Sequence, residues 1–181
     1  MRINKWYLLA AAVTVGTIGL TCSSGPSIPA GATAVSPFNV EKYLGRWYEI
    51  ARFDYRFERN LNNVTADYSL NPDGTIRVLN RGFDYVKNKW KESTGKAKFV
   101  NDSNTGRLKV SFFGPFYSGY NVIALDPKYR YALIAGDNLD YLWILSRETT
   151  IPDNVREEYI QKAESIGYDT KKLIWVKHDK K

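Results

Sequence analysis

The strongest constraint on the fold is a series of short strand-like segments that are separated by turn residues. Each segment is rich in Tyr, Phe, Val and Ile, and the breaks include Asn71-Pro72-Asp73-Gly74 and Asn104-Thr105-Gly106. Eight such strands joined by short loops favour an all-β fold, an up-and-down antiparallel β-barrel, because closure removes both sheet edges. The predicted strands cover residues 46–55, 63–70, 75–84, 90–100, 107–113, 119–125, 130–136 and 140–147.

One C-terminal helix and a short ninth strand are expected after the eight strands. Pro152 suits the first turn of a helix, and Gly167 suits its end. The apolar residues of this segment recur on one face, so the helix should pack against the outside of the barrel. They are Val155, Tyr159, Ala163 and Ile166. Residues 173–176 are apolar and predict a strand that adds to the barrel wall.

The N-terminus predicts export. A basic start and an apolar stretch precede Cys22, as in a secretory signal, so residues 1–21 are interpreted as a lipoprotein-type signal peptide. Cys22 is the only cysteine and resembles the residue that is acylated in bacterial lipoproteins. The alternative is an ordinary signal whose cleavage leaves a free thiol. Residues 22–36 are rich in Ser, Gly, Pro and Ala and predict a flexible tether, followed by one domain over residues 37–181.

The composition bears on other classes of function. Removing residues 1–21 takes away Arg2 and Lys5 and no acids, so the net charge falls from +7 to +5. This basic surface suits anionic lipid or plain solvation, and export with no clustered basic face argues against nucleic acid. The only histidine, His178, lies in the charged tail, so no common general base is expected in the barrel. We therefore predict no catalytic residue, no metal site and no cofactor.

Strand alternation predicts which side chains point into the barrel. Trp47 on the first strand should close the barrel floor, with Gly45 beside it and the Arg147 guanidinium stacked on the indole as a cation–π partner. The same phase, followed round the barrel, mixes small residues with aromatic ones and predicts a cavity instead of a filled core. The predicted ligand-binding wall consists of Phe53, Ala66, Tyr68, Val78, Asn80, Val110, Phe112, Tyr120, Val122, Ile134, Tyr141 and Trp143.

Three features of this inner ring stay open at this point. Glu49 shares the side of Trp47, and an inward carboxyl must be paired or protonated, either with Arg147 or within an internal network. The phenols of Tyr68, Tyr120 and Tyr141 need hydrogen-bond partners, which a ligand head group could supply near the rim. The aromatic loop over residues 114–119 either gates the mouth and contacts a membrane or subunit, or packs locally over the barrel end.

Three segments together resemble the bacterial outer-membrane lipocalins, which are similar to apolipoprotein D. They are Tyr43–Phe53, Lys109–Phe116 and Asp140–Arg147. The resemblance implies an eight-stranded calyx that binds lysophospholipids or fatty acids and serves envelope maintenance, and in some members a homodimer. With Cys22 as anchor, it implies a membrane-attached protein at the outer membrane whose barrel faces the periplasm. The alternatives are an envelope interaction protein with a filled barrel and, less favoured, an enzyme acting on a lipophilic substrate.

Overall fold

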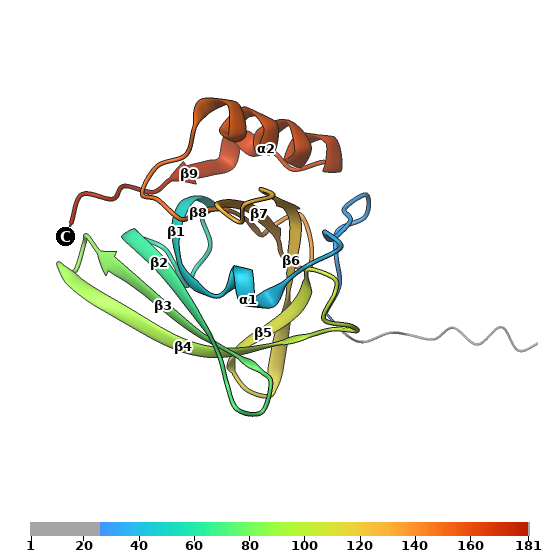
Figure 1. Ribbon diagram of the computed structural model, residues 1–181. Coiled ribbons are helices and arrows are strands. Elements are labelled where there is room, and N and C mark those ends of the chain that lie inside the picture. Colours follow the sequence, from blue (N-terminus) through green and yellow to red (C-terminus); the bar gives the residue numbers. More distant parts are fainter. Residues whose placement is uncertain (1–25, 181) are drawn as a thin grey trace, which may run out of the picture.

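A single antiparallel sheet wraps into a closed barrel in the computed structural model, which describes residues 26–180 (Figure 1). The strands are paired in chain order from β2 to β8, and β1 closes the ring by pairing with both β2 and β8. Their bounds are β1 Gly45–Phe53, β2 Leu61–Leu70, β3 Ile76–Asp84, β4 Lys89–Phe99, β5 Arg107–Phe113, β6 Phe116–Leu125, β7 Tyr131–Ala135, β8 Leu142–Ser146 and β9 Leu173–Trp175. The predicted eight-stranded barrel with a ninth strand is confirmed.

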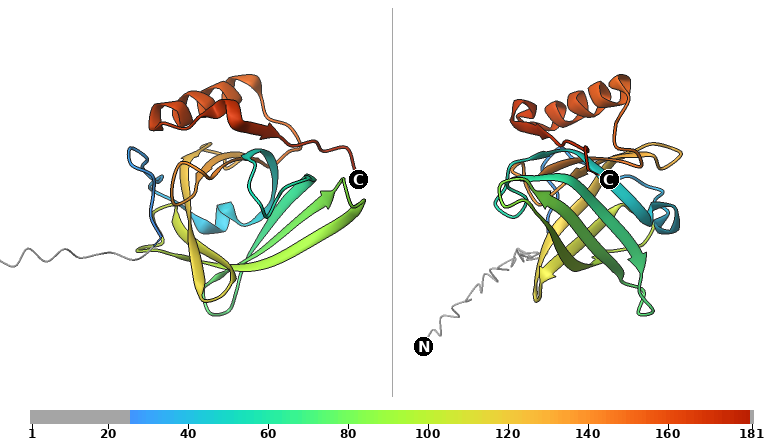
Figure 2. Two further views of the ribbon diagram at one scale, coloured as in Figure 1. Left: turned by 180° about the vertical axis from the view of Figure 1, so that it is seen from behind. Right: turned by 90° about the vertical axis from the view of Figure 1, so that its left-hand side faces the viewer.

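The C-terminal helix α2 (Asp153–Ile166) lies against the outside of the barrel, beside the short strand β9 (Figures 1 and 2). Tyr159 and Ala163 are buried there against the outward side chains Leu142 and Ile144 of β8. Gly167 ends the helix in the left-handed conformation, with φ +107°, as glycine readily does. The 3₁₀ turn η1 (Thr170–Lys172) then leads into β9, which pairs with the end of β1. Within residues 26–180, no helix is long and apolar enough to cross a membrane.

A β-bulge in β1 reverses the inward and outward phase of its second half. Glu49 pairs with Leu145 and Ala51 pairs with Ile144, so one extra β1 residue lies between these pairs. Ile50 and Ala51 therefore both face the outer core, and Phe53 packs there against Tyr168, with ring centroids 5.8 Å apart. The prediction that Phe53 shares the inner side with Trp47 is wrong, because simple alternation does not survive a bulge.

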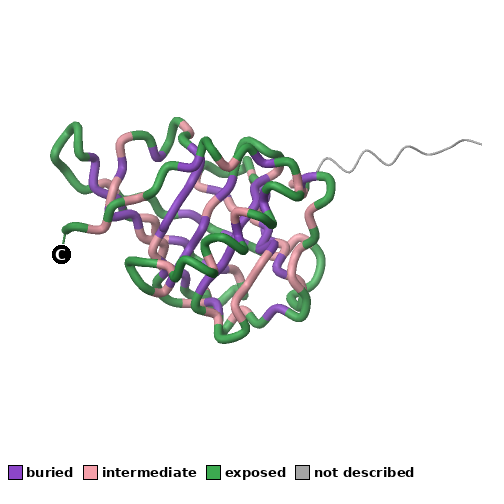
Figure 3. Tube along the Cα trace, turned by 90° about the horizontal axis from the view of Figure 1, so that it is seen from above, coloured by how far each residue is buried: buried purple, intermediate pink, exposed green. Residues whose placement is uncertain are grey.

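The segment before the barrel is held by hydrogen bonds along the outside of the sheet. Ser27 donates to Asp137 from its backbone N–H and its hydroxyl, and the Val35 N–H donates to the Val122 carbonyl at 2.8 Å. Residues 26–36 therefore belong to the packed domain, although their composition predicted a flexible tether. Cys22 and residues 1–21 lie outside the described residues. Figure 3 shows the resulting pattern, with buried positions along the strands and exposed ones at the loops.

Candidate functional site: the barrel cavity

The barrel encloses a cavity of about 600 Å³ that opens at one end. The open end is formed by the β1–β2, β3–β4, β5–β6 and β7–β8 connections, because β1 runs from the floor at Trp47 towards Phe53 at the mouth. Most of the lining is apolar, with a few polar groups near the mouth, which is typical of a site for a small hydrophobic ligand. The structure thus shows an open barrel and not one filled by its own side chains.

The floor is closed by Trp47 and Arg147, as the sequence predicted. The Arg147 guanidinium carbon lies 3.9 Å from the centroid of the Trp47 ring, and the indole is fully buried. Arg147 also donates to five backbone carbonyls, those of Lys42, Tyr43, Leu44, Arg46 and Tyr129, at 2.7–3.2 Å. Gly45 has φ +91°, a conformation that glycine adopts without strain, so the chain turns here from the helix α1 (Val40–Tyr43) into β1. Trp47 does not line the cavity.

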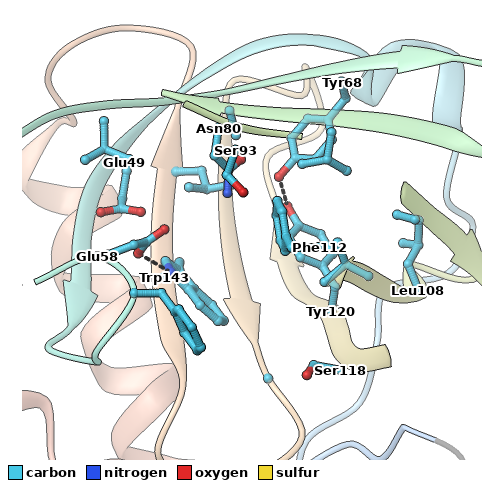
Figure 4. Close-up of a pocket in the computed structure, with 18 of the residues that line it drawn as sticks. Glu49, Glu58, Tyr68, Asn80, Ser93, Leu108, Phe112, Ser118, Tyr120 and Trp143 are labelled. Carbon is cyan, nitrogen blue, oxygen red and sulfur yellow. Dashed lines mark hydrogen bonds between the residues drawn. The ribbon is translucent and has the colours of Figure 1, made fainter. Parts of the chain in front are cut away.

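Three tyrosines form the deep end of the cavity, next to the floor. The Tyr120 hydroxyl is hydrogen-bonded to the Tyr68 hydroxyl at 2.9 Å (Figure 4) and to the Tyr43 hydroxyl at 2.6 Å. The Tyr43 ring packs on Trp47, with centroids 4.8 Å apart. Burial raises the pKa of all three phenols, so they stay neutral. Each hydroxyl therefore has a partner within the trio, although two hydrogen bonds use only two of the three hydroxyl protons.

A buried charged cluster lies on the wall nearer the mouth. Arg52 donates from Nη1 to Glu49 Oε1 at 2.8 Å and from Nη2 to the carbonyl oxygens of Glu58 and Leu61. Glu58 belongs to the β1–β2 loop and accepts a hydrogen bond from Trp143 Nε1 at 3.2 Å (Figure 4). The partner of Glu49 is therefore this internal network and not Arg147. Burial raises the pKa of Glu49 well above its usual range, and the nearby Glu58 charge adds to the rise.

One polar atom of the wall is left without a partner. Asn80 lines the cavity, and its Oδ1 is buried and has no hydrogen-bond partner among the described residues. It lies on β3 opposite Ser93 of β4, which also lines the cavity (Figure 4). A buried acceptor without a donor is costly, so this oxygen is a ready partner for a hydroxyl or N–H of a bound molecule.

The predicted wall residues fall into three groups. Most of them line the cavity: Ala66, Tyr68, Val78, Asn80, Val110, Phe112, Tyr120, Tyr141 and Trp143. Val122 and Ile134 belong to the core inside the barrel but are fully buried and do not line the cavity. Phe53 lies outside the barrel because of the β1 bulge. Whether the lining residues contact a ligand stays a prediction.

Other wall residues were not predicted. Ile76, Ala97 and Leu108 also line the cavity. Ile76 is two residues from Val78, and Leu108 is two residues from Val110. Ala97 lies on β4, between the lining strands β3 and β5. Alternation applied to the full length of every strand would have found them. Glu58, Tyr55 and Phe57 come from the β1–β2 loop, whose path over the mouth no periodicity encodes. Tyr117 of the aromatic loop lies on the outer face between Lys98 and Lys109, so it does not gate the mouth.

Comparison with known proteins identifies the family. A lipocalin-like domain model matches residues 38–178. The chain belongs to the lipocalin family. It is 53% identical to the outer membrane lipoprotein Blc of Citrobacter freundii over 169 residues. The aligned region covers 93% of this chain and 95% of that protein.

More distant lipocalins also match this chain. It is 40% identical to temperature-induced lipocalin-1 of Arabidopsis thaliana, over 77% of this chain and 78% of that protein. It is 36% identical to apolipoprotein D of Rattus norvegicus, over 73% and 75%. The structure of insecticyanin from the tobacco hornworm superposes with a TM-score of 0.67 at 18% identity, over 84% of this chain and 87% of that one. This last likeness concerns the fold alone. The chain is therefore a lipocalin with an open apolar cavity for a small hydrophobic ligand.

Proposed function

We propose that this lipocalin binds one monoacyl lipid, a lysophospholipid or a fatty acid, in its cavity and stores or transports it without chemical conversion. The observation that carries the proposal is the open, largely apolar cavity of about 600 Å³. Its volume lies within the range of about 300–1,000 Å³ that is usual for small-molecule sites. Burial of an acyl chain contributes about 0.8 kcal/mol per methylene, so the tail supplies most of the affinity.

The polar groups of the wall support a tail-first orientation. The three tyrosine hydroxyls at the deep end are neutral and hydrogen-bonded to one another, whereas Asn80, Ser93 and the Glu49–Arg52–Glu58 cluster lie nearer the mouth. The acyl tail then points towards the floor and the head group stays at the mouth. Asn80 Oδ1 accepts a hydrogen bond from a glycerol hydroxyl of the lipid.

The charges of the wall favour a lysophospholipid over an ionised fatty acid. Both cations that line the cavity within residues 26–180 already have carboxylate partners, Arg81 with Glu92 at 3.4 Å and Lys91 with Asp84 at 2.8 Å. A fatty acid carboxylate would therefore meet no unpaired cation that compensates its charge. A zwitterionic lysophospholipid needs no such cation because its own charges compensate each other.

The proposed location is the outer membrane, with the barrel in the periplasm. The relatives that cover most of this chain are named outer membrane lipoproteins, and Cys22 is positioned as the acylated residue. In this position the protein takes up monoacyl lipids that are released from damaged membrane, in envelope maintenance or stress. A homodimer, as the family resemblance allows, stays a prediction.

A cavity-blocking variant with a matched control tests this function. Ala97 on β4 lines the cavity, and its neighbour Lys98 faces outwards. Ala97→Phe places a ring in the space of about three methylenes, so the affinity for lysophosphatidylethanolamine should fall about 60-fold, at about 0.8 kcal/mol per methylene. Lys98→Phe adds the same ring on the outer face and should bind as the parent protein does. Equal affinity of all three proteins would contradict binding in the cavity.

A further inference from the structure

Exposed apolar side chains gather at the open end of the barrel. Those that are more than half exposed lie in three of the four connections there: Phe57 in the β1–β2 loop, Tyr85 and Val86 in the β3–β4 hairpin, and Phe113 and Phe116 beside the β5–β6 turn. Their exposed fractions are 66%, 55%, 65%, 69% and 80%. We call these five residues the mouth rim. Large apolar side chains that are exposed together usually mark an interaction surface.

The mouth rim is one connected surface. The rings of Phe57 and Phe113 are 6.3 Å apart, so the β1–β2 loop contacts the β5–β6 hairpin across the opening. The Tyr85 N–H donates to the Asn60 carbonyl at 3.1 Å, which joins the β3–β4 hairpin to the same loop. Phe57, Phe113 and Phe116 also line the cavity. Whatever covers the mouth rim therefore lies directly at the cavity entrance.

Cations surround these apolar side chains. Arg56, Lys87 and Lys89 are exposed, and none of them has a carboxylate within 4.0 Å in the part of the chain that the structure describes. The acids of the same segments are engaged elsewhere. Asp54 pairs with Arg59, Asp84 with Lys91, and Glu58 is buried beside Arg52. The surface around the mouth rim thus presents uncompensated positive charge.

We propose that the mouth rim docks onto a phospholipid bilayer that contains anionic lipids. Aromatic side chains are favoured in the interfacial zone of a membrane, and lysines and arginines near the surface are attracted by anionic head groups. The two features occur together here on the three connections that border the cavity. A second copy of the chain is a poorer occupant, because a two-fold interface through this surface would bring Arg56, Lys87 and Lys89 of both copies together.

A gap in the barrel wall near the mouth gives a lipid a route from the bilayer into the cavity. β4 pairs with β5 only over Lys96–Phe99, and the remainder of β4 towards the mouth has no partner on that side. The residues on both sides of the gap line the cavity, among them Ser93 and Phe112. A barrel that is seated by its mouth rim holds this gap close to the lipid surface, so an acyl chain passes between bilayer and cavity with little exposure to water.

The test is vesicle binding by the protein without its lipid anchor. Residues 22–181 with Cys22→Ser keep every described element of the fold. This protein should cofloat with vesicles of phosphatidylethanolamine and phosphatidylglycerol, more weakly with pure phosphatidylcholine, and less at high salt. Replacing Arg56, Lys87 and Lys89 together by Gln should lower binding to the anionic vesicles about 100-fold, about fivefold for each cation. Val86→Asp should also weaken it.

A control triple variant removes the same charge elsewhere. Lys128, Lys162 and Lys171 are exposed and lie in the β6–β7 connection, in α2 and in η1. Their replacement by Gln should leave vesicle binding within about twofold of the parent. None of Arg56, Val86, Lys87 and Lys89 lines the cavity, so the rim variants should keep the parent affinity for monomeric lysophospholipid. Vesicle binding and lysophospholipid binding therefore test the docking proposal and the proposed function separately.

Three results would overturn the proposal. The first is a parent protein that does not bind the anionic vesicles. The second is an equal loss in the rim and control triples, which would indicate net charge alone. The third is a dimer in solution that Val86→Asp or Phe116→Asp dissociates while vesicle binding is unchanged, which would make this surface a contact between copies.

Discussion

Replacing Arg147 with alanine tests the closure of the barrel floor. The substitution removes the guanidinium that stacks 3.9 Å above Trp47, a contact worth about 0.5–1 kcal/mol where it is partly exposed. It also removes the donors to five carbonyls. Those of Tyr43, Leu44 and Tyr129 are partly buried and lose charge-assisted hydrogen bonds that water replaces only in part. We expect the free energy of unfolding to fall by about 3–5 kcal/mol, a large part of the stability of a domain of this size.

Urea unfolding, followed by circular dichroism and tryptophan emission, measures this loss. Arg147→Lys restores the charge but not the planar fork, so it should recover only part of the stability. Arg130→Ala is the matched control, because Arg130 pairs with Asp126 at 3.1 Å on the surface and should cost less than about 1 kcal/mol. A loss for Arg147→Ala that equals the loss for Arg130→Ala would refute this account of the floor.

Three further predictions concern the wall, the outer core and the anchor. Because the pKa of Glu49 is raised, the folded protein binds the Glu49 proton more tightly than the unfolded chain does. The free energy of unfolding should therefore fall as the pH rises from about 4.3. Glu49→Gln should make this fall smaller when unfolding is measured as a function of pH. Phe53→Ala should cost about 3–5 kcal/mol of stability in urea unfolding but leave lysophospholipid affinity unchanged, since Phe53 lies outside the cavity; weakened binding by a folded variant would contradict that position. Cys22→Ser should make the protein releasable from cell membranes by a high-salt wash, whereas the acylated parent stays bound; a Cys22→Ser protein that still cofractionates with the outer membrane after that wash would argue against the anchor.

The sequence predicted the architecture well because the barrel follows from local signals. Turn residues such as those at Asn71–Gly74 separate strands of alternating polarity, and the Trp47–Arg147 pair fixes which ends meet at the floor. The outward Leu142 and Ile144 were expected under the helix and do lie there. Each of these features can be predicted from the periodicity of a strand or helix, or from the chemistry of one pair of residues.

The remainder of the site depends on features that alternation does not encode. A single bulge in β1 moves Phe53 outwards and Arg52 inwards, which changes both the wall and the partner of Glu49. Glu58 reaches the wall from a loop whose path is set by tertiary contacts, including its hydrogen bond from Trp143. Neighbouring side chains cover Val122 and Ile134 completely, so these two residues are core and not cavity wall. Periodicity predicts the direction in which a side chain points, but not whether it meets a cavity or another side chain.

The most direct test of the central claim uses a lysophospholipid brominated in the middle of its acyl chain, since bromine quenches tryptophan emission on close approach. Trp143 lines the cavity, whereas Trp175 lies on β9 outside the barrel. Titration of the protein without its anchor should give saturable quenching at one lipid per barrel, largely lost in Trp143→Phe and kept in Trp175→Phe. Quenching that does not saturate, or that survives unchanged in Trp143→Phe and disappears in Trp175→Phe, would show that the lipid binds elsewhere and would contradict the cavity as the lipid site.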